Sequence, residues 1–187
     1  MSGTLKYTVF KTAMGWVGIL ASEKGVLGTT LPQPTPGEAT TALGPAVKLA
    51  GKDDGALEDL ASRVKGYFDG RRVDFHDVLD MGRYKPFQRR VWEATRRIPR
   101  GETRSYLWLA KHVRRARAAR AVGQALGKNP FPIIVPCHRV IASDGGLCGF
   151  GGGLEMKRRL LEMESGKKPA HGEPPGRPYK RGPVAGG

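Results

Sequence analysis

Short hydrophobic runs recur over residues 5–31, and four glycines separate them. The runs are rich in Val, Ile, Thr, Tyr and Phe, residues that favour strands. This pattern predicts a meander of antiparallel strands. Residues 32–54 are rich in Pro, Gly, Thr and Ala and show weak periodicity, so we expect a loop that holds at most a poorly packed helix.

A helical period replaces the strand pattern over residues 56–70, and Gly70 supplies a stop. The apolar positions on this helical face are Leu57, Leu60, Val64, Tyr67 and Phe68. Residues 71–80 then alternate apolar and polar side chains, which predicts a half-buried strand. His76 lies in that segment, and we expect it at the surface because no set of ligand side chains accompanies it.

Arginines and apolar residues occupy opposite sides of the predicted helix over residues 86–98. Ser105 is a candidate N-cap for a second helix, residues 105–113. The three-residue step 114–116 leads to a third helix, residues 117–129. Two short helices joined so tightly resemble a helix-turn-helix. The alanines and the glycine of the third helix would let its backbone approach either a core or a phosphate-lined groove.

Residues 133–143 predict a strand, and the glycine-rich segment 144–153 follows it. Residues 154–164 predict a final amphipathic helix with Leu154, Leu160, Leu161 and Met163 as its buried side. The fold class is therefore mixed α/β (α+β). We expect an N-terminal α/β domain over residues 1–80, a mainly helical domain over residues 81–165, and a disordered, basic, Pro/Gly-rich tail over residues 166–187.

Composition and chain length indicate the class of protein and the compartment in which it folds. A chain of 187 residues can bury a sizeable core, and its two cysteines, Cys137 and Cys148, cannot form a disulfide framework. The N-terminus lacks the pattern of a signal peptide, and no apolar run approaches the length needed to cross a bilayer. We therefore expect a soluble cytoplasmic protein with no membrane partner.

Positive charge points to a polyanionic partner. The formal net charge is +15, and between Arg83 and Lys128 the acidic residues are Glu93 and Glu102 alone. A solvated Arg-rich surface would explain this excess, but a basic stretch so concentrated on predicted helices favours nucleic acid.

Cys137 follows Pro136 directly and precedes His138. It is either a small buried hydrophobe or a nucleophile beside a base. Adjacent side chains of an extended backbone point to opposite faces, so a relay from the thiol to His138 needs a kinked backbone or a bridging water. An acid on the far side of the imidazole would orient it, and Glu164 is one candidate among several carboxylates.

The segments RAVGQALGKNP, PCHRV and GFGGGLEMKRRLLEME, in this order and spacing, resemble the O6-alkylguanine-DNA alkyltransferases. The resemblance extends from about Lys6 to Glu164 and is closest from Phe87 onward. It implies a ribonuclease-H-like N-terminal domain and a winged helix-turn-helix-like C-terminal domain. The activity it implies is single-turnover transfer of an alkyl group from O6-alkylguanine to a cysteine, with O4-alkylthymine as a second candidate substrate.

Family roles then fall on the matching positions. Cys137 would accept the alkyl group, His138 and Glu164 would form a water-linked relay that activates the thiol, and Asn129 would brace the nearby backbone. Tyr106 would crowd a phosphate and help to rotate the damaged nucleotide out of the duplex. The remaining DNA contacts would come from Arg120 as an intercalating finger, Arg115, Ser143, Ala121 and Gly123. The substrate pocket would include Val140, Phe150 and Gly151.

Three features depart from the family pattern. Phe150 stands where a Tyr is usual, so no phenol there can donate to the guanine oxygen. The turn between the helices reads Arg114-Arg115-Ala116 in place of Gly-x-Pro. The N-terminal part has no cysteine for the zinc that some relatives bind, and Cys148 is expected to be a packing residue.

The resemblance implies no cofactor and no metal, double-stranded DNA with alkylated guanine as partner, and a monomer without an obligate protein partner. Location would be cytoplasmic, associated with the nucleoid during repair. A noncatalytic alkyltransferase-like lesion binder or a sensor of alkylation is the alternative, although such lesion binders replace the acceptor cysteine.

Overall fold

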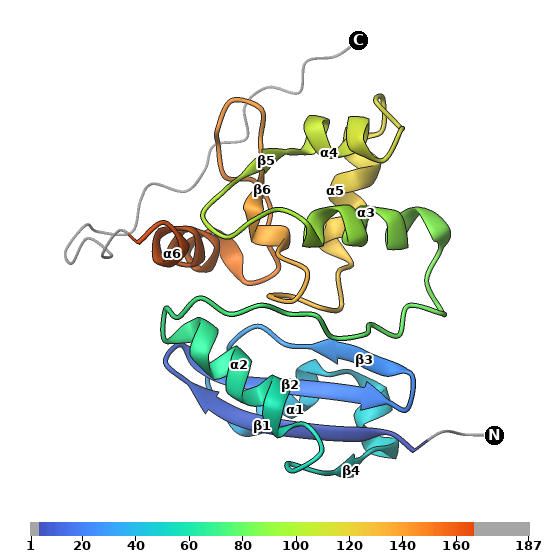
Figure 1. Cartoon of the computed structure of the whole chain (residues 1–187), viewed down its shortest axis with the longest axis vertical. Helices are drawn as coiled ribbons and strands as arrows, with labels where there is room; N and C mark the ends of the chain where they lie inside the picture. Colours follow the sequence, from blue (N-terminus) through green and yellow to red (C-terminus); the bar gives the residue numbers. More distant parts are fainter. Residues whose placement is uncertain (1–3, 167–187) are drawn as a thin grey trace.

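The computed structural model describes residues 4–166, and most of the predicted tail lies outside them. The chain forms two parts, one above the other in Figure 1, and a long segment between α2 and α3 runs along their boundary. The lower part holds a four-stranded sheet and two helices. The upper part holds α3 to α6 and two short strands. This is the mixed α/β architecture expected from the sequence.

The N-terminal sheet has the strand order β3-β2-β1-β4. Strands β1 (Lys6–Thr12), β2 (Gly15–Ser22) and β3 (Gly25–Thr29) form the predicted antiparallel meander. The expected loop that follows contains α1 (Pro36–Ala42), the 3-10 helix η1 (Pro45–Leu49) and β4 (Gly51–Lys52), which pairs parallel with β1. Helix α2 (Glu58–Phe68) lies where the apolar period predicted it.

The predicted strand at residues 71–80 is wrong. The chain there is extended and its exposure alternates, but it pairs only at one bridge, Leu79 with Val26 of β3. Gly25 explains how the segment comes so close, because a Cβ at that position would lie 2.3 Å from the Val78 carbonyl oxygen. The alternation therefore reflects a chain that lies between two parts of the core, with one side of it toward solvent.

The C-terminal part follows the predicted order of helices. These are α3 (Pro86–Arg96), α4 (Tyr106–His112), α5 (Ala119–Gly127) and α6 (Gly153–Glu164). Ser105 caps α4 as predicted, and its Oγ accepts from the Trp108 amide at 3.0 Å. The connection between α4 and α5 is longer than expected, and Arg114 in it takes a left-handed φ of 58°. Strands β5 (Arg104–Ser105) and β6 (Val140–Ile141) pair parallel.

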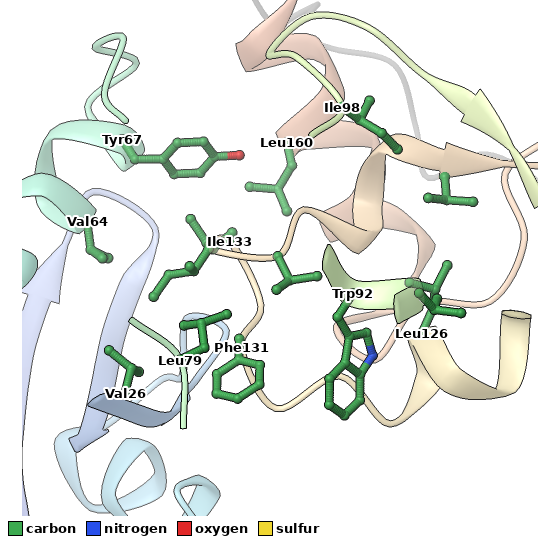
Figure 2. Close-up of a cluster of buried hydrophobic side chains, with 14 of the residues drawn as sticks. Val26, Val64, Tyr67, Leu79, Trp92, Ile98, Leu126, Phe131, Ile133 and Leu160 are labelled. Carbon is green, nitrogen blue, oxygen red and sulfur yellow. The ribbon is translucent and has the colours of Figure 1, made fainter. Parts of the chain in front are cut away.

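A contiguous hydrophobic core joins the two parts. Figure 2 shows Val26, Val64 and Leu79 near the sheet, Phe131 and Ile133 in the middle, and Trp92 and Leu126 in the helical part. The Trp92 indole nitrogen donates to the Ala125 carbonyl at 2.9 Å, which fixes α3 against α5. Because this core is shared, groups from both parts can be held rigidly at one site.

Candidate active site

Cys137 begins the short 3-10 helix η2 (Cys137–Arg139), so the strand predicted over residues 133–143 is wrong except at β6. The apolar run is interrupted at Ile133, which is buried and has a φ of 75°. A β-branched residue in the left-handed region cannot continue a strand and indicates a strained backbone held by its surroundings. The 3-10 turn that follows replaces the extended backbone with the kink that a relay between these neighbours requires, and it leaves Cys137 at the cavity and His138 buried.

Asn129 contacts the thiol directly. Its Nδ2 lies 3.3 Å from Cys137 Sγ and donates to the Val135 carbonyl at 3.0 Å. Its Oδ1 accepts from the Phe131 amide at 2.9 Å. Asn129 therefore ties both ends of the loop that leads to the nucleophile and gives the sulfur a hydrogen-bond donor.

A cavity of about 360 Å³ opens beside Cys137. Its walls bring together Tyr106, Gly123, Asn129, Phe150 and Gly151, all of them predicted site residues, along with Leu31, Leu126, Gly127, Pro132 and Gly149. A Cβ at Gly123 would lie 3.6 Å from the Tyr106 ring, an ordinary contact distance, so α5 and the ring are close neighbours in this wall.

Val140 is not among the residues that line this cavity. The side chain is fully buried, and the residue pairs in β6. Its carbonyl instead accepts from Lys157 Nζ at 2.7 Å. The position therefore supports the loop of the nucleophile from behind.

His138 and Glu164 form a buried pair on the other side of η2. His138 Nε2 lies 2.8 Å from Glu164 Oε1, and the two side chains are 1% and 0% exposed. Arg139 donates to both carboxylate oxygens at 2.9 Å. His138 Nδ1 is buried without a hydrogen-bond partner among residues 4–166. Buried polar atoms are rarely unpaired, which indicates a role in the chemistry for this nitrogen. It is the ring nitrogen that can accept a proton.

Burial and neighbouring charges shift the pKa values of Cys137, His138 and Glu164 in different directions. Burial raises the pKa of the Cys137 thiol, against the opposing effects of the Asn129 hydrogen bond and the Lys157 charge. Burial also lowers the pKa of His138, and the Glu164 contact opposes this only in part. Burial would raise the pKa of Glu164, but His138 and Arg139 outweigh it and hold that pKa well below its usual range. The resting state is therefore a neutral thiol, a neutral imidazole and a carboxylate, and the expected thiolate must form during reaction.

Two side chains that the sequence did not single out for chemistry belong to this site. Tyr67 of α2 donates from its hydroxyl to Glu164 Oε1 at 2.6 Å. Lys157 of α6 is fully buried, and its Nζ also donates to the Cys148 carbonyl at 3.0 Å. A lysine on the apolar face of the last helix was an available signal for the second. Tyr67 lies at a core position of its helix, so nothing in its spacing distinguishes it from a packing residue.

The residues predicted to contact DNA fall into two groups, those exposed at the surface and those at the wall of the cavity. Arg115, Arg120 and Ser143 are exposed, and Ala121 is half-buried on α5. Gly123 faces the Tyr106 ring inside the cavity wall. Tyr106 thus connects the first turn of α4 with the cavity that holds the thiol.

Among residues 4–166, no helix is long and apolar enough to cross a bilayer. That part of the chain also holds no group of three His, Cys, Asp or Glu side chains placed to bind a metal ion.

Comparison with known proteins places this site in a family. Residues 86–166 match the DNA-binding domain of 6-O-methylguanine DNA methyltransferase. A methylated-DNA–protein-cysteine methyltransferase of Mycobacterium bovis is 49% identical over 118 residues, which cover 63% of this chain and 71% of the relative. An inducible methyltransferase of the same name from Bacillus subtilis is 43% identical over 113 residues, covering 60% and 63%.

Solved structures extend the likeness to the N-terminal part. An O6-methylguanine methyltransferase variant from Mycobacterium tuberculosis superposes with a TM-score of 0.75 at 37% identity, covering 89% of this chain and 96% of that one. The Mycobacterium tuberculosis OGT in complex with DNA gives a TM-score of 0.73 at 38% identity, covering 88% and 96%. The chain therefore belongs to the methylated-DNA–protein-cysteine methyltransferase family.

Proposed function

We propose that the protein repairs DNA by transferring the alkyl group of O6-alkylguanine to Cys137, once per molecule. The observation that carries this proposal is the position of Cys137, between an open cavity and a buried His138–Glu164 pair. The names of the family members and the structure of a relative with DNA support the same activity and partner. The extension to O4-alkylthymine rests on the resemblance alone.

The chemistry is a single displacement at the alkyl carbon. The sulfur–carbon bond forms as the bond from carbon to the guanine oxygen breaks, and the electron pair of that bond returns to the base. The thiol proton passes to His138 Nδ1, directly or through water, and guanine finally takes a proton at its ring nitrogen. A neutral imidazole with a free Nδ1 suits this step, because a general base must be unprotonated. The product is a thioether, which cellular thiols do not reverse.

DNA binding would bring the damaged base to the cavity. A cysteine fixed in a folded protein cannot reach the O6 substituent of a stacked guanine, so the nucleotide must leave the duplex. We assign Tyr106 to the phosphate beside the extruded nucleotide and Arg120 to the space it leaves. Arg115 and Ser143 would contact the DNA backbone, while the small Ala121 lets α5 sit close to the minor groove.

We further propose a division of labour between residues 1–80, which scaffold the site, and residues 81–165, which bind DNA and carry the nucleophile. Action on chromosomal DNA fits the expected cytoplasmic, nucleoid-associated location. A lesion-binding protein without transfer remains the competing function, and the Cys137 thiol beside the cavity argues against it.

Peptide masses after reaction with DNA test the proposal. The protein is incubated with a duplex containing one O6-methylguanine and digested with trypsin. Residues 129–139 carry Cys137 and residues 140–157 carry Cys148, so the two thiols fall in separate peptides. We expect the first peptide to gain the mass of one CH₂ group and the second, an internal control, to stay unchanged.

The Cys137→Ser variant should bind the same duplex and gain no mass. Binding by the unaltered protein without any mass gain would reject transfer and support the lesion binder. A mass gain confined to the Cys148 peptide would reject Cys137 as the acceptor.

A further inference from the structure

Tyr67 reaches the relay from the opposite part of the molecule. Figure 2 shows its side chain extending from α2 toward Leu160 of α6, with the hydroxyl at the far end. That hydroxyl lies 2.6 Å from Glu164 Oε1 and 3.2 Å from His138 Nε2. Tyr67 is 1% exposed, so water does not compete for these contacts.

The ring of Tyr67 is fixed independently of the relay. Phe68 meets it edge-on at a centroid distance of 5.2 Å, and the Arg100 guanidinium lies 5.5 Å from its centroid. Arg100 is held in turn by the Gly70 and Arg71 carbonyls, at 3.0 and 2.6 Å. The hydroxyl is therefore placed by the packing at the end of α2.

The hydrogen bonds around Glu164 determine where the protons lie. A carboxylate only accepts, so the single Tyr67 hydroxyl proton goes to Glu164 Oε1 at the shorter of its two distances. His138 Nε2 then faces two acceptors, the carboxylate and the phenol oxygen, and must carry the imidazole proton. This assignment leaves Nδ1 with a lone pair, in agreement with its lack of a partner in the described chain.

Tyr67 keeps its proton under all ordinary conditions. Burial, reinforced by the negative charge of Glu164, raises the pKa of Tyr67 well above its usual value. The hydroxyl is therefore a permanent donor to the carboxylate. A donor of this kind withdraws part of the negative charge that would otherwise stabilise a protonated His138. The positive charges of Arg139 and Lys157, which also act on the imidazole, lower its pKa in the same direction.

We propose that Tyr67 is a positioning residue of the alkyl-transfer site, contributed by the N-terminal part, which fixes the Glu164 carboxylate and keeps His138 unprotonated at Nδ1. The proposal rests on the alkyl transfer proposed above. It gives the N-terminal part a share in the chemistry, beyond its role as a scaffold.

The test compares Tyr67→Phe with Phe10→Leu in single-turnover transfer from a methylated duplex across pH 5.5 to 8.5. Loss of the hydroxyl lets the Glu164 charge act more strongly on the imidazole, so the His138 pKa rises and the acidic limb of the rate profile moves to higher pH. We expect Tyr67→Phe to react about tenfold more slowly near pH 6, with a smaller loss near pH 8. Phe10→Leu removes buried bulk from β1, and Phe10 contacts neither the relay nor the Tyr67 ring. It should lower the melting temperature and leave the limb in place.

Nitrogen NMR of the His138 ring provides a measurement on the unaltered protein. We expect a protonated Nε2 and an unprotonated Nδ1 at neutral pH, and the opposite tautomer would overturn the proposal. A Tyr67→Phe profile with the same limb and rate as the unaltered protein would also overturn it. Failure of the proposed function is distinguishable, because the unaltered protein would then transfer no alkyl group at any pH.

Discussion

The two sides of Cys137 differ in almost every physical property. On one side lies a cavity with mostly apolar and glycine walls, where the sulfur has one side-chain hydrogen bond, from Asn129. On the other side lies a buried, charged cluster in which the Glu164 carboxylate accepts from Tyr67, His138 and Arg139. The cavity suits an alkylated base, and the charged cluster suits a proton. Substrate binding and thiol activation therefore depend on two separate sets of side chains, which meet at η2 and where the Phe150 ring faces His138.

The largest effect should come from breaking the charged side. His138→Gln removes the base, and we expect transfer to slow by about 10²- to 10³-fold because proton abstraction loses its acceptor. The acidic limb should disappear as well, since neutral His138 is the form that reacts and its pKa, lowered by burial, sets that limb. Single-turnover rates between pH 5 and 9 measure both.

His76→Gln is the matched control for this change, because His76 is exposed on the segment between the two parts. It should leave the rate and the limb unchanged. Retention of the acidic limb in His138→Gln would assign the titration to another group and contradict the relay.

A smaller effect is expected on the cavity side, from Phe150→Tyr. Phe150 lines the cavity with Cys137, and its ring meets the His138 ring edge-on at 6.5 Å. A phenol there can donate to the guanine oxygen as it regains electron density, so we expect transfer to accelerate by up to about tenfold. The gain should appear in the rate constant at saturating DNA, and DNA affinity should change little.

Phe87→Tyr on α3 adds the same hydroxyl away from the cavity and should have no effect on the rate. An equal gain in both variants would show that the acceleration does not come from a donor in the cavity.

The periodicity of apolar residues predicted those helices and strands that pack one apolar face against the core. The meander of β1–β3 and helices α2 to α6 were predicted because each buries one stripe against a neighbour. The strands expected at residues 71–80 and 133–143 failed for different reasons. The first is extended but lies across the core boundary with one bridge, and the second is broken by the left-handed Ile133. The alternation of apolar and polar residues reveals neither where an extended segment lies in the fold nor which residue adopts a strained φ.

The candidate site was predictable in its nucleophile and imidazole, because Cys137 and His138 are adjacent in a motif. Glu164 was one carboxylate among several until the packing of α6 selected it. Nothing in the sequence identifies Tyr67 as a site residue, because an aromatic side chain on a helix face packs in the core whether or not its hydroxyl has a hydrogen-bond partner. Contacts such as those of Glu164 and Tyr67 depend on how distant helices pack, so they can be identified only from the folded structure.

The ionisation of Cys137 in the free protein tests the account most directly. The difference in thiolate absorbance between the unaltered protein and Cys137→Ser, followed from pH 6 to 11, isolates this thiol from Cys148. We predict ionisation above the ordinary cysteine value of about 8.5, because burial raises the pKa of Cys137. A Cys137 already ionised at pH 7 would contradict a neutral thiol that gives up its proton to His138 only as the alkyl group arrives.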